Sequence, residues 1–271
     1  FYNGKEDSTW FFYYENKILK ATESYNRGKK NGHNRYYSKT GQLAQETVFN
    51  QNLADSTWTS YYDNNVVKSR ESFAKGKKQG DWLYYFENGQ LESSGKFEND
   101  LKEGEVKTFY KNGKPASVSS YCKNKPCGKI TEYYENGNQK LEKEYIDSLT
   151  FQIHNMWDEK GKQVITNGTG TITAQYNGGI IKAQGAYKGG YMDGLWRYFH
   201  SNGELDYEAN YEKGVLNGFY SSYYKNHKEK SEGWFVYGKK NGLWKFFTEK
   251  GEKEMEGTLK DGLRNDKWTY Y

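Results

Sequence analysis

A step of 24 residues separates recurring small residues along this chain of 271 residues. The first series is Ser8, Gly32, Ser56, Gly80, Gly104 and Gly128, and the second is Gly170, Gly194, Gly218, Gly242 and Asp266. From Gly128 to Gly170 the distance is 42 residues, one full step plus 18. A fixed period of this length indicates a repeat architecture. We predict repeat arrays over residues 1–151 and 170–271, joined by a shortened repeat at 152–169 into one continuous ribbon.

Each repeat reads as two short strands. With the opening residue as position 0, the Gly80 repeat has Trp82 at position 2, Tyr85 at position 5, the pair Asn88-Gly89 at positions 8 and 9, and Phe97 at position 17. Asn-Gly between aromatic runs is typical of a β-hairpin with a type I′ turn, which needs positive φ at both central residues. We therefore expect position 2 to face position 15, 4 to face 13 and 6 to face 11.

The spacing of large residues excludes helices and favours strands. Apolar residues recur every second position and helix caps are absent, so a period of 3.6 does not compete. Thirty glycines and only two prolines fit glycine turns between extended segments. The predicted fold is an all-β, elongated single-layer antiparallel meander, a β-hairpin solenoid of about eleven repeats. With strands roughly 4.8 Å apart, the ribbon would be on the order of 100 Å long.

One face of this ribbon is expected to be aromatic. Positions 2, 4, 6, 11 and 17 share a face, whereas position 5 lies among polar residues on the other. Gly95 would lie opposite Trp82, so that the indole fills the space above the glycine. A single layer can bury its apolar face only by coiling, by stacking between neighbouring repeats, or against a partner. If a partner contacts this face, the residues involved would be those at position 2: Trp10, Trp58, Trp82, Trp196, Tyr220, Trp244 and Trp268.

The segments Gly80-Asp-Trp-Leu-Tyr-Tyr-Phe-Glu-Asn-Gly89 and Gly194-Leu-Trp-Arg-Tyr-Phe199 resemble the MORN repeat, and more closely its bacterial variant. This resemblance extends over nearly the whole chain. It implies elongated β-hairpin arrays that act as scaffolds and protein-binding surfaces, with some members linked to membrane lipid. The bacterial variants often carry an antitoxin label, which implies no active site. The pattern is broken at Asn34, His154 and Ser222, where an aromatic residue is expected.

Two cysteines, Cys122 and Cys127, flank a predicted turn. Across a hairpin their Cβ atoms come within reach of a disulfide, although free thiols remain an alternative. A zinc site is disfavoured because no second pair of ligands lies nearby in sequence. A disulfide would indicate an oxidising compartment, which in a bacterium is the cell envelope, in the periplasm or at the outer-membrane surface. The alternative is a cytoplasmic protein.

No catalytic or metal-binding pattern stands out. The four histidines are dispersed, no nucleophile motif occurs, and alternating carboxylates such as Glu252 and Glu254 read as a solvated strand face. We expect no catalytic residues, no metal and no cofactor. Basic pairs recur at one place in the repeat and would form a positive edge for anionic lipid or for solubility: Lys29, Lys30, Lys77, Lys78, Lys239 and Lys240. The net charge of only +5 argues against nucleic acid.

These features predict a non-enzymatic scaffold or adaptor. It would bind other proteins along its aromatic face, as a subunit of a larger complex associated with a bacterial outer membrane. One alternative is a module that binds glycan or peptidoglycan by stacking sugars on aromatic rows. A second is an antitoxin-like partner that neutralises a toxin. Because Phe1-Tyr-Asn-Gly4 matches the second half of a repeat and Tyr270-Tyr271 lies within the first strand of another, we expect the sequence to be part of a longer protein.

Overall fold

The computed structural model describes residues 1–147 and 149–271. This part of the chain contains 24 β-strands and no helix, which confirms the all-β antiparallel meander. It accordingly has no helix that is long and apolar enough to cross a membrane. The chain divides into two compact units, residues 1–140 with 144–151 and residues 141–143 with 152–271. The division falls at the start of the predicted short repeat.

In the order of the sequence, the strands of the first half are β1 (Ser8–Tyr13), β2 (Leu19–Asn26), β3 (Lys29–Lys30), β4 (Gly32–Tyr37), β5 (Leu43–Asn50), β6 (Leu53–Tyr61), β7 (Val67–Ala74), β8 (Lys77–Tyr85), β9 (Leu91–Glu98), β10 (Leu101–Phe109), β11 (Pro115–Cys122), β12 (Lys125–Tyr133) and β13 (Gln139–Tyr145). Those of the second half are β14 (Phe151–Trp157), β15 (Gln163–Thr166), β16 (Thr169–Gln175), β17 (Ile181–Lys188), β18 (Tyr191–Phe199), β19 (Leu205–Glu212), β20 (Val215–Tyr223), β21 (Glu229–Val236), β22 (Lys239–Phe247), β23 (Lys253–Lys260) and β24 (Leu263–Tyr270).

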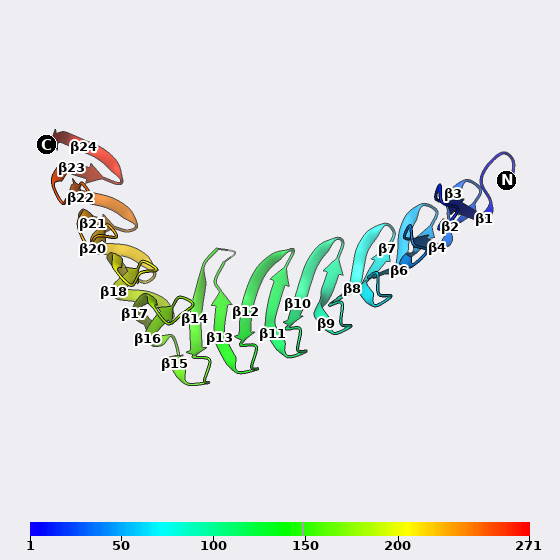
Figure 1. The fold of residues 1–271 in the computed structure, drawn as a ribbon, viewed down its shortest axis with the longest axis horizontal. Helices are drawn as coiled ribbons and strands as arrows, with labels where there is room; N and C mark the ends of the chain where they lie inside the picture. Colours follow the sequence, from blue (N-terminus) through cyan, green and yellow to red (C-terminus); the bar gives the residue numbers. More distant parts are fainter. Residues whose placement is uncertain (148) are drawn as a thin grey trace. The chain divides into compact units, whose positions relative to one another are not determined.

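Within each unit, most strands that follow one another in the chain pair antiparallel, so a hairpin lies beside the next hairpin, and β2 pairs with both β3 and β4 (Figure 1). The predicted register is confirmed at two of three places, because Trp82 pairs with Gly95 and Tyr84 with Ser93. The third is wrong: Leu91 at position 11 pairs with Tyr85 at position 5, not with position 6. A bulge between Tyr84 and Tyr85 shifts the register by one residue.

The turn type explains that shift. In the Gly80 repeat the amide of Gly89 donates to the carbonyl of Phe86, and Gly89 has a φ of 83° while Asn88 has no positive φ. This is a type I turn followed by one left-handed residue, which produces a bulge. The predicted type I′ turn at Asn88-Gly89 is therefore wrong. Turns with positive φ at both central residues occur instead between repeats, as at Asn99 (49°) and Asp100 (70°).

In most repeats the opening residue lies in a second bulge, whereas Gly170 pairs with Ile165 without one. Between β9 and β10, Lys96 pairs with Glu103 and Ser94 with Lys107, so Gly95 alone faces Gly104, Glu105 and Val106. The opening residue has positive φ in all eleven repeats, from 55° at Ser56 to 154° at Gly170. Glycine avoids the steric cost of this conformation, which accounts for the small residue that defines the period.

The short repeat closes differently. Strand β15 has only four residues, and β14 extends beyond it. The amide of Ile153 donates to the carbonyl of Gly190 (3.0 Å) and the amide of Gly168 donates to the carbonyl of His154 (2.7 Å). The glycine turns of two later hairpins thus satisfy the strand groups that the missing residues would otherwise pair.

Candidate binding surfaces

The tryptophan face, defined here as the sheet face that carries position 2, is the core of the protein. Trp82, Trp196 and Trp244 are only 2, 3 and 0% exposed. Their side chains cannot contact a partner, so the expectation that they form the contact surface is wrong for these three. Trp10, Trp58, Tyr220 and Trp268 are half-buried. This face is therefore largely buried by stacking between neighbouring repeats.

Glycine at position 15 makes the stacking possible. A Cβ atom on Gly257 would lie 2.5 Å from a ring carbon of Trp268, although the register partner of Gly257 is Trp244. The indole of the following repeat therefore covers this glycine. The same holds for Gly185 under Trp196 and for Gly233 under Trp244. Only at Gly95 does the indole come from the paired position, as expected from the sequence.

Three of the indole N–H groups join one repeat to the next as well. Trp58 donates to the carbonyl of Val48 (3.0 Å), Trp196 to that of Ala186 (3.0 Å) and Trp244 to that of Trp234 (3.2 Å), always ten residues earlier. Aromatic contacts continue across repeats, with Trp244 5.8 Å from Tyr220 and 5.3 Å from Phe235 between ring centroids. Burial and bonding together fix each hairpin on its neighbour.

The basic pairs divide between two environments. Lys29, Lys77 and Lys239 are exposed, whereas Lys30, Lys78 and Lys240 are half-buried on the tryptophan face. The two members of a pair alternate because successive strand residues point to opposite faces. The predicted positive edge therefore contains one lysine of each pair, and the other is an internal residue.

The internal lysines have two kinds of partner. Lys30 binds Glu23 at 2.7 Å, and Lys78 binds Glu71 at 2.5 Å. Both carboxylates stand at position 15, where other repeats carry glycine. Lys240 belongs to a repeat with Gly233 at that position and instead lies 4.0 Å from the ring centroid of Trp244. Burial lowers the pKa of Lys240 below its ordinary value.

Two rows of side chains lock the turns of successive repeats. Tyrosine hydroxyls at position 6 donate to the carbonyl at position 5 of the next repeat, as in Tyr62 to Tyr85 (2.7 Å) and Tyr110 to Tyr133 (2.7 Å). Asparagine amides at position 8 donate to the next carbonyl at position 7, as in Asn112 to Glu135 (3.0 Å). Position 8 was read from the sequence only as a turn residue, and its regular 24-residue recurrence was the signal for this second role.

On the face opposite the tryptophans, the second compact unit carries an exposed apolar row. We define it as Leu195, Phe219, Trp234 and Leu243. Leu195, Trp234 and Leu243 are 40, 54 and 48% exposed, and the ring of Phe219 packs edge-on against Trp234 at 5.9 Å. Leu195, Phe219 and Leu243 all stand at position 1, where the other repeats carry polar or charged residues: Thr9, His33, Thr57, Asp81, Glu105, Lys129, Thr171 and Lys267.

Charged residues beside the apolar row pair with one another. Arg197 binds Glu208 at 3.1 Å, and Lys245 binds Glu232 at 2.6 Å. These residues lie at positions 3 and 14, on the same face as the row. Two ion pairs therefore border the row. The sequence analysis did not predict this row, because it considered the large residues at position 2 and not those at position 1.

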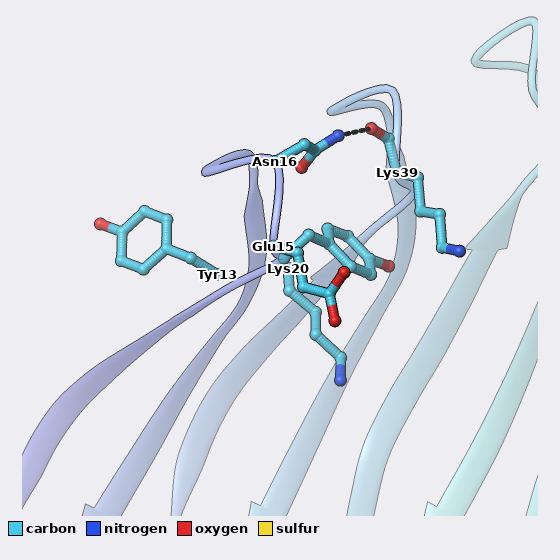
Figure 2. A pocket seen from close by; sticks show the side chains of 6 residues that line it. Tyr13, Glu15, Asn16, Lys20 and Lys39 are labelled. Atoms are coloured by element: carbon cyan, nitrogen blue, oxygen red, sulfur yellow. Dashed lines mark hydrogen bonds between the residues drawn. The ribbon is translucent and has the colours of Figure 1, made fainter.

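Shallow hollows lie beside the first turn in two repeats. One, of about 440 Å³, is lined by Tyr13, Tyr14, Glu15, Asn16, Lys20 and Lys39 (Figure 2). The other, of about 420 Å³, is lined by Tyr61, Tyr62, Asp63, Asn64, Lys68 and Glu87, which are the same positions 48 residues later. Neither was predicted, but the sequence Tyr-Tyr-acid-Asn followed by lysine four residues later is shared by both.

Titratable groups do not converge on a catalytic arrangement in the described residues. No group of three or more His, Cys, Asp and Glu side chains there is close enough to hold a metal ion. His227 pairs with Glu204 at 2.7 Å and His200 lies 3.5 Å from Asp206, each as an isolated pair. Cys122 and Cys127 form a disulfide with their Cα atoms 5.9 Å apart.

Comparison with known proteins matches four of the repeats to a family. Four segments match the family described as the MORN repeat variant: residues 78–99, 102–123, 126–147 and 192–213. A search of curated proteins found no match.

Among solved structures, the chain is similar to TcdB2-TccC3, with 12% identity and a TM-score of 0.21. It is also similar to a Tc holotoxin pore of Photorhabdus luminescens, with 12% identity and a TM-score of 0.18. These matches cover 94 and 97% of this chain but only 17% of each of those chains.

Proposed function

We propose that this chain, which carries MORN repeats of the variant type, is a non-enzymatic scaffold that binds other proteins. The observation that carries the proposal is the exposed apolar row. Large apolar side chains gathered on a surface that is otherwise polar are typical of protein-binding sites. A tryptophan at the centre of such a site commonly supplies much of the binding energy. We therefore propose a contact surface on the face opposite the position-2 tryptophans that the sequence suggested.

The repeat-to-repeat bonding supports this role. Tyr224 and Asn226 fix the turn of the Gly218 repeat on that of the Gly242 repeat, so the part of the apolar row on these two repeats stands on a preorganised surface. Docking of a partner on this surface therefore costs little conformational entropy of this chain, which favours high affinity. The disulfide between Cys122 and Cys127 supports an oxidising compartment, and with it the proposed place in a bacterial envelope complex.

The proposal is tested by affinity capture from native extracts followed by mass spectrometry. The double variant Trp234→Ser and Leu243→Thr removes two of the four side chains of the apolar row but leaves the buried Trp244 in place. The matched control is Phe11→Ser, which removes an aromatic side chain that is 59% exposed on another hairpin. We expect partners of the unaltered chain to be lost only with the double variant, while circular dichroism stays unchanged. Retention of every partner by the double variant would contradict the proposal.

A further inference from the structure

We propose that the two hollows beside Asn16 and Asn64 are paired binding sites for a neutral, linear oligosaccharide. The inference does not depend on the protein-binding role, because the hollows lie in the first compact unit and the apolar row in the second. Its basis is two hollows of nearly equal size in which five of six lining positions carry the same kind of side chain, while the sixth is Lys39 in one and Glu87 in the other.

The floor of each hollow is fixed by bonds to the next repeat. The hydroxyls of Tyr14 and Tyr62 each donate at 2.7 Å to the carbonyls of Tyr37 and Tyr85. The amides of Asn16 and Asn64 donate to the carbonyls of Lys39 (3.2 Å) and Glu87 (3.0 Å), the first of which is drawn in Figure 2. The rings are therefore held in place before a ligand arrives.

Above that floor stand one carboxylate and one ammonium group from the same hairpin. Lys20 lies 5.8 Å from the ring centroid of Tyr14, and Lys68 lies 5.5 Å from that of Tyr62. Glu15 and Lys20 extend side by side from the turn, with Tyr13 on one side and Lys39 on the other (Figure 2). The ring of Tyr13 is 61% exposed and open to stacking.

This chemistry selects the class of ligand. A carboxylate accepts hydroxyl donors and an ammonium group donates to hydroxyl acceptors, so a sugar carrying neighbouring hydroxyls satisfies both. The tyrosine rings offer apolar surface for the C–H face of a pyranose. A phosphate or nucleic acid would meet the carboxylate of Glu15 or Asp63 as a like charge. The open, polar walls lack the enclosed apolar surface that a lipid chain requires.

The separation of the hollows favours a chain of sugars. They lie 48 residues apart, which is two repeats or four strand intervals, roughly 19 Å. A linear oligosaccharide long enough to reach both hollows converts the second contact into an intramolecular one. Weak binding at each hollow then becomes measurable binding of the whole ligand.

The test uses the full chain and calorimetric titration with cellohexaose, chitohexaose and the matching disaccharides. We expect one hexasaccharide to bind at least tenfold more tightly than its disaccharide. Glu15→Gln should remove this gain by disabling one hollow, and Glu15→Gln with Asp63→Asn should weaken binding further. A third copy of the motif, Tyr133-Tyr134-Glu135-Asn136 with Lys140, stays unaltered in both variants. The matched control is Lys230→Met, because Lys230 also lies over a tyrosine, Tyr224 at 5.7 Å, but its turn carries Lys225 in place of the acid.

Three outcomes would overturn the inference. The first is that none of these sugars binds. The second is binding that the double variant leaves unchanged while thermal unfolding shows it to be folded. The third is tighter binding of polyphosphate or heparin than of any neutral hexasaccharide, which would assign the hollows to polyanions. Loss of sugar binding with protein partners retained would separate this site from the proposed scaffold role.

Discussion

A Cβ atom on Gly95 would lie 2.7 Å from the Cζ2 atom of Trp82, the residue that pairs with Gly95 across the hairpin. Real Cβ atoms do not approach ring carbons so closely, and Trp82 is 2% exposed with no free space to move into. We predict that Gly95→Ala lowers the free energy of unfolding by about 1–3 kcal/mol, the usual cost of overpacking. Urea denaturation followed by tryptophan fluorescence measures it.

The control for this change lies one repeat later. Ser119 occupies position 15 of the Gly104 repeat, pairs with Val106 and already carries a Cβ atom. Ser119→Ala should therefore alter stability by less than about 0.5 kcal/mol. Equal losses from both substitutions would show that strand propensity, and not the indole above Gly95, sets the preference for glycine.

Trp234 and Trp244 provide a matched pair ten residues apart. Trp244 is 0% exposed and Trp234 is 54% exposed on the opposite face. Trp244→Ala should cost about 3–5 kcal/mol, because it removes a buried ring and leaves a cavity between repeats. Trp234→Ala should cost well under 1 kcal/mol, since most of that ring already contacts water. Similar melting temperatures for the two variants would contradict the proposed division between core and contact surface.

Alkaline pH should loosen the first repeats. Burial and a hydrogen bond to the carboxylate of Glu23 raise the pKa of Tyr25 to about 12, from 10.0. An acid whose pKa is raised on folding stabilises the fold fully below the unfolded value. That stability is lost as the pH rises from 10 towards 12. Stability measured against pH should fall in this window, and Tyr25→Phe should flatten part of the fall.

An absorbance titration of tyrosine checks whether the Glu23 carboxylate raises the pKa of Tyr25. In Glu23→Gln the carboxylate is gone, and the pKa of Tyr25 should move back towards 10. Lys30 would lose its 2.7 Å partner in the same variant, so Lys30→Met serves as the comparison. A titration of Tyr25 that is identical in Glu23→Gln and the unaltered chain would leave burial as the sole cause.

The period and the strand pairing were readable from the sequence because both depend on local alternation. Trp82 opposite Gly95 and Tyr84 opposite Ser93 follow from counting residues away from the turn. The turn itself was misread because Asn-Gly suits both a type I′ turn and a type I turn followed by a left-handed glycine. The two turn types differ by one residue in loop length, and the residue types in the turn do not reveal which loop length is adopted.

The proposed contact surface was harder to predict because it depends on which side chains of one repeat are covered by the following repeat. The bulge that sets Gly95 against three residues brings the following repeat over position 15. Rings at position 2 are thereby buried, and the residues at position 1 decide what the surface offers. A sequence read one repeat at a time cannot show this, because no repeat buries its tryptophan alone.

The disulfide between Cys122 and Cys127 gives the last prediction. The two cysteines are five residues apart in sequence, and the disulfide closes a short loop across a turn between two repeats. Because so short a loop restricts the unfolded chain only modestly, breaking it should cost about 2 kcal/mol. Thermal unfolding with and without a phosphine reductant measures the loss, and Cys122→Ser with Cys127→Ser should reproduce it without reductant. If reductant lowers the melting temperature of this double variant as well, the effect does not come from the disulfide.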